Sequence, residues 1–96
     1  MIEIKGRAIC AARDLLKLTQ HELAAACKIS KGTLSGIEGE TTKPHAATIR
    51  KIAQELTTRG IEFSNGTGIG IRLDYRKAAA YAAAKGDETP VDPNLG

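Results

Sequence analysis

The sequence predicts a mainly α protein of one domain: four packed helices, then a β-hairpin and a short alanine-rich helix. Apolar residues recur every three or four positions through residues 5–58, which is the spacing of amphipathic helices. They alternate with polar residues over residues 61–73, which is the spacing of strands. Aromatic residues make up only 3% of the 96 residues, so Ile, Leu and Ala must build most of the core, which suits packed helices.

Capping residues place the four helices of the first sixty residues. Thr19, with Glu22 three positions later, has the spacing of a capping box, and Ser30 can cap the next helix. Pro44 marks a loop, and Gly60 lies just past the end of the fourth helix, where a C-cap is expected. We therefore expect helices over residues 5–18, 20–27, 31–38 and 46–58.

The hairpin should join residues 61–63 to residues 69–73. A two-residue turn at Asn65-Gly66 would pair Phe63 with Gly68. Pairing Phe63 with Ile69 instead would place the apolar residues of both strands on one face. We therefore expect a longer loop or a bulge rather than a minimal hairpin.

Two further segments follow the hairpin. Residues 74–85 favour helix, with Asp74 as the cap, but a short alanine-rich helix is marginal unless something docks on it. Residues 86–96 are polar and contain proline, so we expect a disordered tail. The expected organisation is a helical domain over 1–60, a hairpin over 61–73, a helix over 74–85 and a tail over 86–96.

Composition excludes several classes of protein. No apolar run is long enough to span a membrane, and the N-terminus lacks a secretory-signal layout, so we expect a cytoplasmic protein with Cys10 and Cys27 reduced. His21 and His45 add no metal-ligand spacing, so neither a metal nor a cofactor is expected. No convincing nucleophile–base set occurs, and we do not expect an enzyme. The net charge of +3 lies within residues 1–63 and permits a nucleic-acid partner.

Residues 20–38 have the pattern of a helix-turn-helix, in which the second helix lies in the major groove of DNA. Ala24 is the small residue needed where the two helices touch. The sequence resembles the phage-repressor/Cro-like helix-turn-helix family (the XRE family) over about residues 5–60. The residues that carry this resemblance are Arg13, Gln20, Glu22, Leu23, Ala24, Ile29, Ser30, Leu34, Ile37, Glu38, Ile49, Ile52 and Leu56.

The resemblance implies roles for particular residues. Arg13 and Glu38 would form a partly buried ion pair between the first and third helices. Gln20 would contact a DNA phosphate, and Lys43 would contact the DNA backbone. The exposed positions that face the bases would be Lys31, Gly32, Thr33 and Gly36, with Ser35 beside them. His21 and Lys28 complete the expected DNA-contacting set.

The sequence departs from the family pattern at three of these positions. Lys28 stands where the turn usually has glycine, so it must adopt a left-handed backbone at a cost of about 1 kcal/mol. Gly32 and Gly36 offer no side chain to a base. Direct reading would therefore rest on Lys31, Thr33 and Ser35, with modest specificity in each half-site.

We expect a sequence-specific transcriptional regulator, such as a repressor, that binds double-stranded DNA as a homodimer on a two-fold operator. Its half-sites would lie about one helical turn apart. The hairpin would form the dimer or partner contact, unless it merely packs on the fourth helix of its own chain; the contact residues would be Phe63, Ile69, Ile71 and Leu73.

The alternative is a helix-turn-helix scaffold that binds protein, as an antiactivator, an adaptor or the antitoxin of a toxin–antitoxin pair. The glycines at reading positions and the modest charge motivate it. The surface around Lys28, Lys31, Lys43 and Arg50 should distinguish the two functions.

Overall fold

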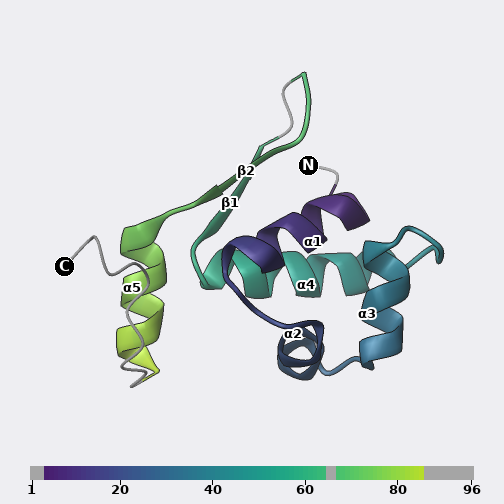
Figure 1. Ribbon diagram of the computed structural model, residues 1–96, viewed down its shortest axis with the longest axis horizontal. Helices are drawn as coiled ribbons and strands as arrows, with labels where there is room; N and C mark the ends of the chain where they lie inside the picture. Colours follow the sequence, from purple (N-terminus) through teal and green to yellow (C-terminus); the bar gives the residue numbers. More distant parts are fainter. Residues whose placement is uncertain (1–3, 65–66, 86–96) are drawn as a thin grey trace.

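The computed structural model describes residues 4–64 and 67–85, and this part of the chain is mainly helical, as predicted (Figure 1). The expected tail over 86–96 and the Asn65-Gly66 turn lie outside the described residues. The elements, in chain order, are α1 (Gly6–Leu15), α2 (Gln20–Cys27), α3 (Lys31–Glu38), α4 (Ala46–Thr58), β1 (Ile61–Ser64), β2 (Gly70–Leu73) and α5 (Tyr75–Ala84).

The predicted bounds of the first helix are wrong at its C-terminal end. α1 ends at Leu15 because Lys17 adopts a left-handed backbone, with φ of 58°. The backbone N–H groups of Lys17 and Leu18 donate to the carbonyls of Asp14 and Arg13, both at 3.0 Å. These two bonds close the helix in a Schellman-type turn, which usually has glycine at the left-handed position.

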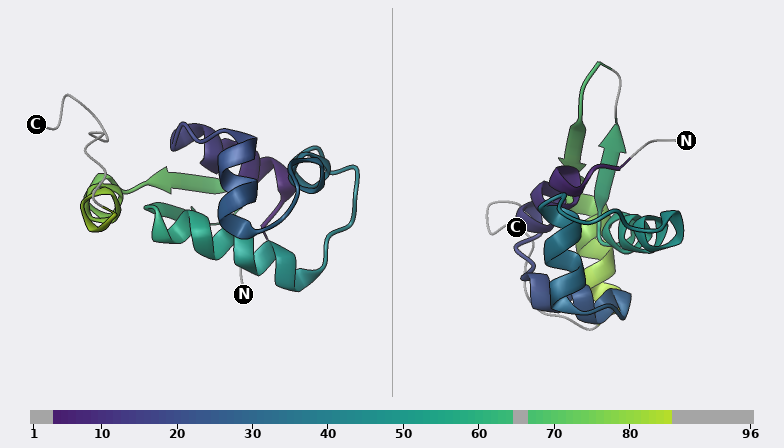
Figure 2. Two further views of the ribbon diagram at one scale, coloured as in Figure 1. Left: turned by 90° about the horizontal axis from the view of Figure 1, so that it is seen from below. Right: turned by 90° about the vertical axis from the view of Figure 1, so that its right-hand side faces the viewer.

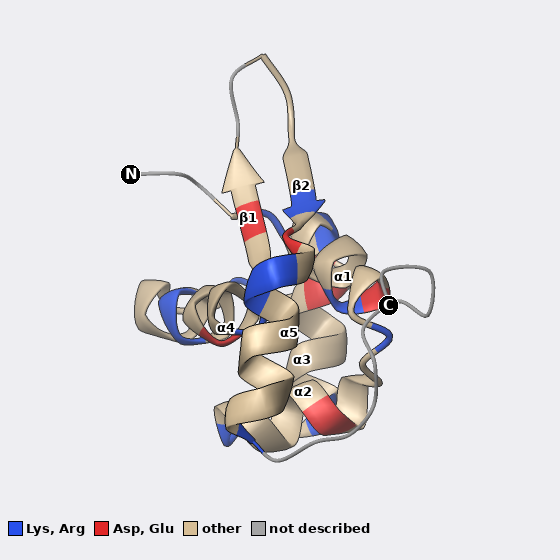
Figure 3. Ribbon diagram, turned by 90° about the vertical axis from the view of Figure 1, so that its left-hand side faces the viewer, with Lys and Arg blue, Asp and Glu red and all other residues tan. Residues whose placement is uncertain are grey.

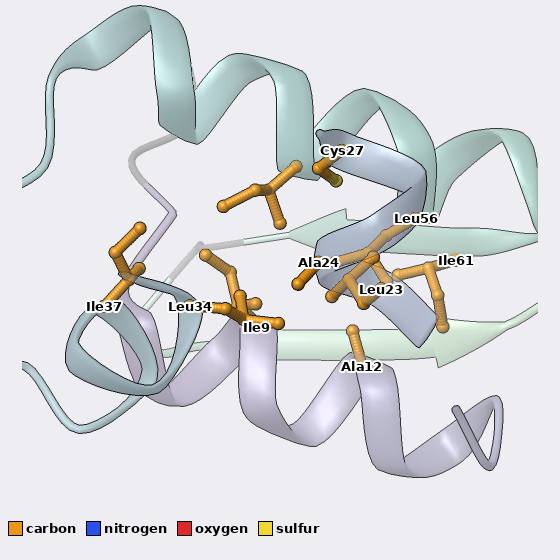
Figure 4. Close-up of a cluster of buried hydrophobic side chains, with 10 residues drawn as sticks. Ile9, Ala12, Leu23, Ala24, Cys27, Leu34, Ile37, Leu56 and Ile61 are labelled. Carbon is orange, nitrogen blue, oxygen red and sulfur yellow. The ribbon is translucent and has the colours of Figure 1, made fainter. Parts of the chain in front are cut away.

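The core lies between the four N-terminal helices. Ile9 of α1, Leu34 of α3 and Leu56 of α4 have no exposed surface, and their side chains belong to one buried cluster between the helices (Figure 4). Ala24 of α2 is also buried in this cluster, where a larger side chain would push α2 away from its neighbours. The core therefore fixes α2 and α3 on the body formed by α1 and α4.

The hairpin has the longer loop that the sequence predicted, but a different register. Phe63 pairs with Ile71 rather than with Ile69, and Ser64 pairs with Gly70. Ile69 consequently lies outside the paired strands and is 50% exposed. Ile71 and Leu73 pack against the chain's own core, because β2 contacts α1 while β1 contacts α4. Phe63 is likewise partly buried against this core, and the expected partner contact of the four apolar hairpin residues stays a prediction.

α5 lies at the opposite end of the molecule from α3 (Figures 1 and 2). Its Ala78 packs against Gly60, where φ is +115° and an added Cβ would lie 2.9 Å from the Ala78 nitrogen. The Arg59 guanidinium lies 4.9 Å from the centre of the Tyr81 ring. Charged residues gather where the hairpin meets α5 (Figure 3), and they include the ion pair of Lys77 with Glu62 at 2.9 Å. These contacts dock a helix that would be marginal alone.

Candidate nucleic-acid interface

The N-terminus of α2 is closed by the predicted capping box. The Glu22 N–H donates to Thr19 Oγ1 at 3.0 Å, and the Thr19 N–H donates to Glu22 Oε1 at 2.9 Å. The hydrogen bond that the Thr19 N–H donates to the Glu22 carboxylate lowers the pKa of Glu22 below its ordinary value. Gln20 is the first residue of α2, so its backbone N–H lies at the positive end of the helix, where phosphate oxygens are favoured.

The turn between α2 and α3 is made at Lys28, which adopts the expected left-handed backbone, with φ of 58° and ψ of 42°. Its N–H donates to the Ala25 carbonyl at 3.1 Å, and the Ile29 N–H donates to the Ala24 carbonyl at 3.0 Å. The turn therefore satisfies two carbonyls in the last turn of α2 and sets the direction in which α3 leaves. The Lys28 side chain is exposed.

The structure brings Arg13 and Glu38 into a two-point ion pair between α1 and α3. Arg13 Nε donates to Glu38 Oε2 at 2.9 Å, and Arg13 Nη2 donates to Glu38 Oε1 at 3.1 Å. Arg13 Nη1 also donates to the Leu18 carbonyl at 2.8 Å. The Glu38 side chain is only 4% exposed, and its hydrogen bonds raise the pKa of Arg13. The pair therefore joins the end of α3 to α1 and to the segment that leads into α2.

The first turn of α3 presents hydrogen-bond donors to solvent. Lys31, Gly32, Thr33 and Ser35 are all exposed. Ser30 Oγ accepts from the Thr33 N–H at 3.0 Å and donates to Thr33 Oγ1 at 2.8 Å. Since the Thr33 oxygen already accepts a proton, its own proton remains for an acceptor outside the chain. A Cβ at Gly32 would approach only Ser30 Oγ, at 3.9 Å, so the surface there is open to a close neighbour.

Gly36, which was expected to be exposed and to face the bases, packs against the loop that follows α3. It is half-buried, and an added Cβ would lie 3.0 Å from Thr42 Cγ2 in the loop after α3. That loop folds back on the helix, since the Thr41 N–H donates to the Gly36 carbonyl at 3.0 Å. Glycine at this position therefore lets the loop pack closely on α3, and a larger residue would require Thr42 to shift.

Three exposed lysines lie within or just after the α2–α3 unit and form no ion pair within residues 4–64 and 67–85: Lys28, Lys31 and Lys43. His21 is exposed one residue after the start of α2. The fourth cation expected on this surface, Arg50, is an exposed residue of α4. It lines a groove between α4 and β1, together with Ile49 and Phe63.

A family model described as Helix-turn-helix matches residues 11–63, which is more than half of the chain. The chain belongs to the phage-repressor/Cro-like helix-turn-helix family. The match begins inside α1 and ends in β1, so it covers the complete α2–α3 unit and the helices that hold it. Membership of this family makes the protein a DNA-binding helix-turn-helix regulator. No curated protein matches the chain.

One feature of this helix-turn-helix unit was missed by the sequence analysis. Gln20 Nε2 donates to Glu38 Oε1 at 3.0 Å, so Gln20 joins the start of α2 to the end of α3. One amide hydrogen of Gln20 is therefore used inside the protein, and its second amide hydrogen and backbone N–H remain for a phosphate. Gln20 and Glu38 both match family positions, so the sequence marked each residue. Their hydrogen bond joins two helices, and the sequence alone does not show that contact.

Two further findings concern membrane-spanning helices and metal sites in the described residues. No helix in the described part of the chain is long and apolar enough to cross a membrane. Across the same residues, no cluster of three or more His, Cys, Asp and Glu side chains could hold a metal ion.

Proposed function

We propose that the protein regulates transcription by binding a two-fold operator as a homodimer, with α3 of each copy in the major groove. The observation that carries the proposal is the exposed first turn of α3, held on the body of the protein at its far end by Glu38. Lys31 and Thr33 offer donors to the acceptors of base edges, and Lys31 can bind guanine O6 and N7. Ser35 lies beside them, and Gly32 lets the backbone approach the groove.

Phosphate contacts would position α3 in the groove. The N-terminus of α2 directs the backbone N–H of Gln20 outward, and His21 lies next to it. Lys28 and Lys43 lie in the turns before and after α3, so they flank the helix on both sides. Because neither lysine has a carboxylate partner in the described part of the chain, binding would release counterions without breaking an ion pair.

The test is fluorescence anisotropy with duplex DNA from the protein's own upstream region and with a scrambled duplex, over a series of salt concentrations. Specific binding about a thousandfold above the scrambled duplex, with a steep salt dependence, is the expected result. Lys31→Ala should lower specific binding by about tenfold or more. Arg76→Ala removes a similar charge from exposed α5 and should leave binding unchanged.

Weak and equal binding to both duplexes would contradict the proposal. It would favour the second function, in which the scaffold binds a protein as an antiactivator, adaptor or antitoxin. The apolar groove between α4 and β1 is the observation that favours this alternative. In that case Lys31→Ala would leave activity intact, and changes at Phe63 would abolish it.

A further inference from the structure

An open groove of about 760 Å³ lies between α4 and β1, away from the α2–α3 unit. Its apolar lining includes Ile49 and Ala53 on one side and Phe63 on the other. Arg50 and Glu62 also line it, so it carries one cation and one anion. An apolar groove with a few charged groups is typical of a surface that binds another protein chain.

The groove runs along the outer edge of β1. Its lining includes Ile61, Glu62 and Phe63, which are consecutive in the strand. Side chains of consecutive strand residues point to opposite faces of a sheet, so a surface that touches all three must meet the edge of the strand. β2 contributes no residue to the lining and pairs with the other edge of β1.

The hydrogen-bond pattern of the hairpin shows which backbone groups face the groove. The Asp74 N–H donates to the Gly60 carbonyl at 2.8 Å. Gly60 lies opposite Asp74, one position before the pair of Ile61 with Leu73. In an antiparallel ladder, hydrogen-bonded pairs alternate with pairs that do not exchange bonds. Because Gly60 and Asp74 form a hydrogen-bonded pair, Glu62 and Arg72 form the next one. Phe63 and Ile71 therefore form a pair that exchanges no backbone hydrogen bonds. Its N–H and carbonyl therefore point away from β2, toward the groove.

We propose that this groove is occupied by a second copy of the chain, whose β1 pairs antiparallel with β1 of the first. The proposal rests on the homodimer of the proposed function and assigns its interface. The two-fold axis passes beside Phe63, so that the Phe63 N–H of each copy donates to the Phe63 carbonyl of the other. The two hairpins then form one four-stranded sheet, and the apolar linings of both grooves are buried.

Two properties favour a second copy over an unrelated strand. Antiparallel pairing of one edge with itself is symmetric, as a two-fold interface requires. With Phe63 opposite Phe63, Glu62 of one copy lies opposite Ser64 of the other, so the register avoids facing like charges. Glu62 also keeps the cations of its own chain, Arg72 at 2.7 Å and Lys77 at 2.9 Å, so its charge stays paired beside the interface.

The test is sedimentation velocity of the full chain, with Ala53→Glu as the disrupting variant. Ala53 is half-buried in the groove, whereas Ala47 is exposed on the same helix outside it, so Ala47→Glu is the matched control. The wild type and the control should sediment at twice the mass of one chain. Ala53→Glu should raise the dimer dissociation constant by about a hundredfold, because each dimer would bury two added carboxylates.

Amide hydrogen exchange of the wild-type protein supplies a second measurement that needs no variant. The Phe63 N–H should be protected at concentrations that give the dimer and should exchange rapidly on dilution to the single chain. A single-chain mass at all accessible concentrations, a dimer with a rapidly exchanging Phe63 N–H, or a dimer unaffected by Ala53→Glu would each overturn the proposal.

Binding to a duplex with a single half-site separates this proposal from the proposed function. If the chain binds the half-site specifically but does not dimerise through β1, the interface is wrong and the DNA-binding function stands. If the dimer forms as described but binds no duplex specifically, the interface stands and the operator-binding function is wrong.

Discussion

Replacing Arg13 with methionine should destabilise the protein by about 3 kcal/mol, because it leaves a buried carboxylate without its cation. Arg13 gives Glu38 two hydrogen bonds, at 2.9 and 3.1 Å, and the Glu38 side chain is only 4% exposed. After the change, Gln20 alone would donate to that carboxylate. The Leu18 carbonyl would also lose its donor. Methionine keeps the packing volume of the arginine stem, so the loss reports the charge and its hydrogen bonds.

Urea unfolding followed by circular dichroism measures this loss as a change in the free energy of unfolding. The double variant Arg13→Met/Glu38→Met is the control, because removing both charges leaves no buried ion unpaired and should restore most of the stability. A loss below about 1 kcal/mol for Arg13→Met is the value typical of a solvent-exposed ion pair. Such a result would refute the argument that burial of Glu38 makes the pair costly to break.

Two further predictions concern backbone strain and pH. Lys28→Gly should raise the free energy of unfolding by about 0.5–1 kcal/mol, since glycine adopts the left-handed backbone without strain. Lys28→Ala keeps a Cβ and should not raise it. Equal effects of the two changes in urea unfolding would contradict the argument. Four carboxyl groups have pKa values below their ordinary values because they accept hydrogen bonds. Glu22 accepts from Thr19, and Glu40 accepts from Arg7. Glu62 accepts from Lys77 and Arg72, and Asp74 accepts from the Lys77 backbone N–H. The folded state therefore binds fewer protons than the unfolded state, and the melting temperature should fall as pH drops below the ordinary glutamate pKa of 4.5; a melting temperature that is constant or rises over that range would be contrary to this prediction.

The helices could be predicted from sequence because their ends are marked locally. Thr19, Ser30 and Asp74 each accept from a backbone N–H three residues later, and that spacing is visible in the sequence. The end of α1 was missed because Lys17 makes the left-handed turn without the glycine that usually marks it.

The hairpin register and part of the interface could not be predicted, because they depend on tertiary contacts. The alternation over residues 61–73 is satisfied equally when Phe63 faces Ile69 or Ile71, and packing of β2 on α1 selects Ile71. The exposure of Gly36 depends on where the loop after α3 folds, which helical spacing does not report. The bond from Gln20 to Glu38 likewise spans 18 residues of sequence.

The two ends of α3 carry separate tasks. Glu38, at the C-terminal end, is buried and bonded to α1 and α2, while Lys31 and Thr33 lie exposed in the first turn. At eight residues, α3 places about two helical turns between these ends. Substitutions in the first turn can therefore change which operator is read without loosening the attachment of the helix. Descendants of this protein could acquire new targets through a few exposed residues, while inheriting the same architecture.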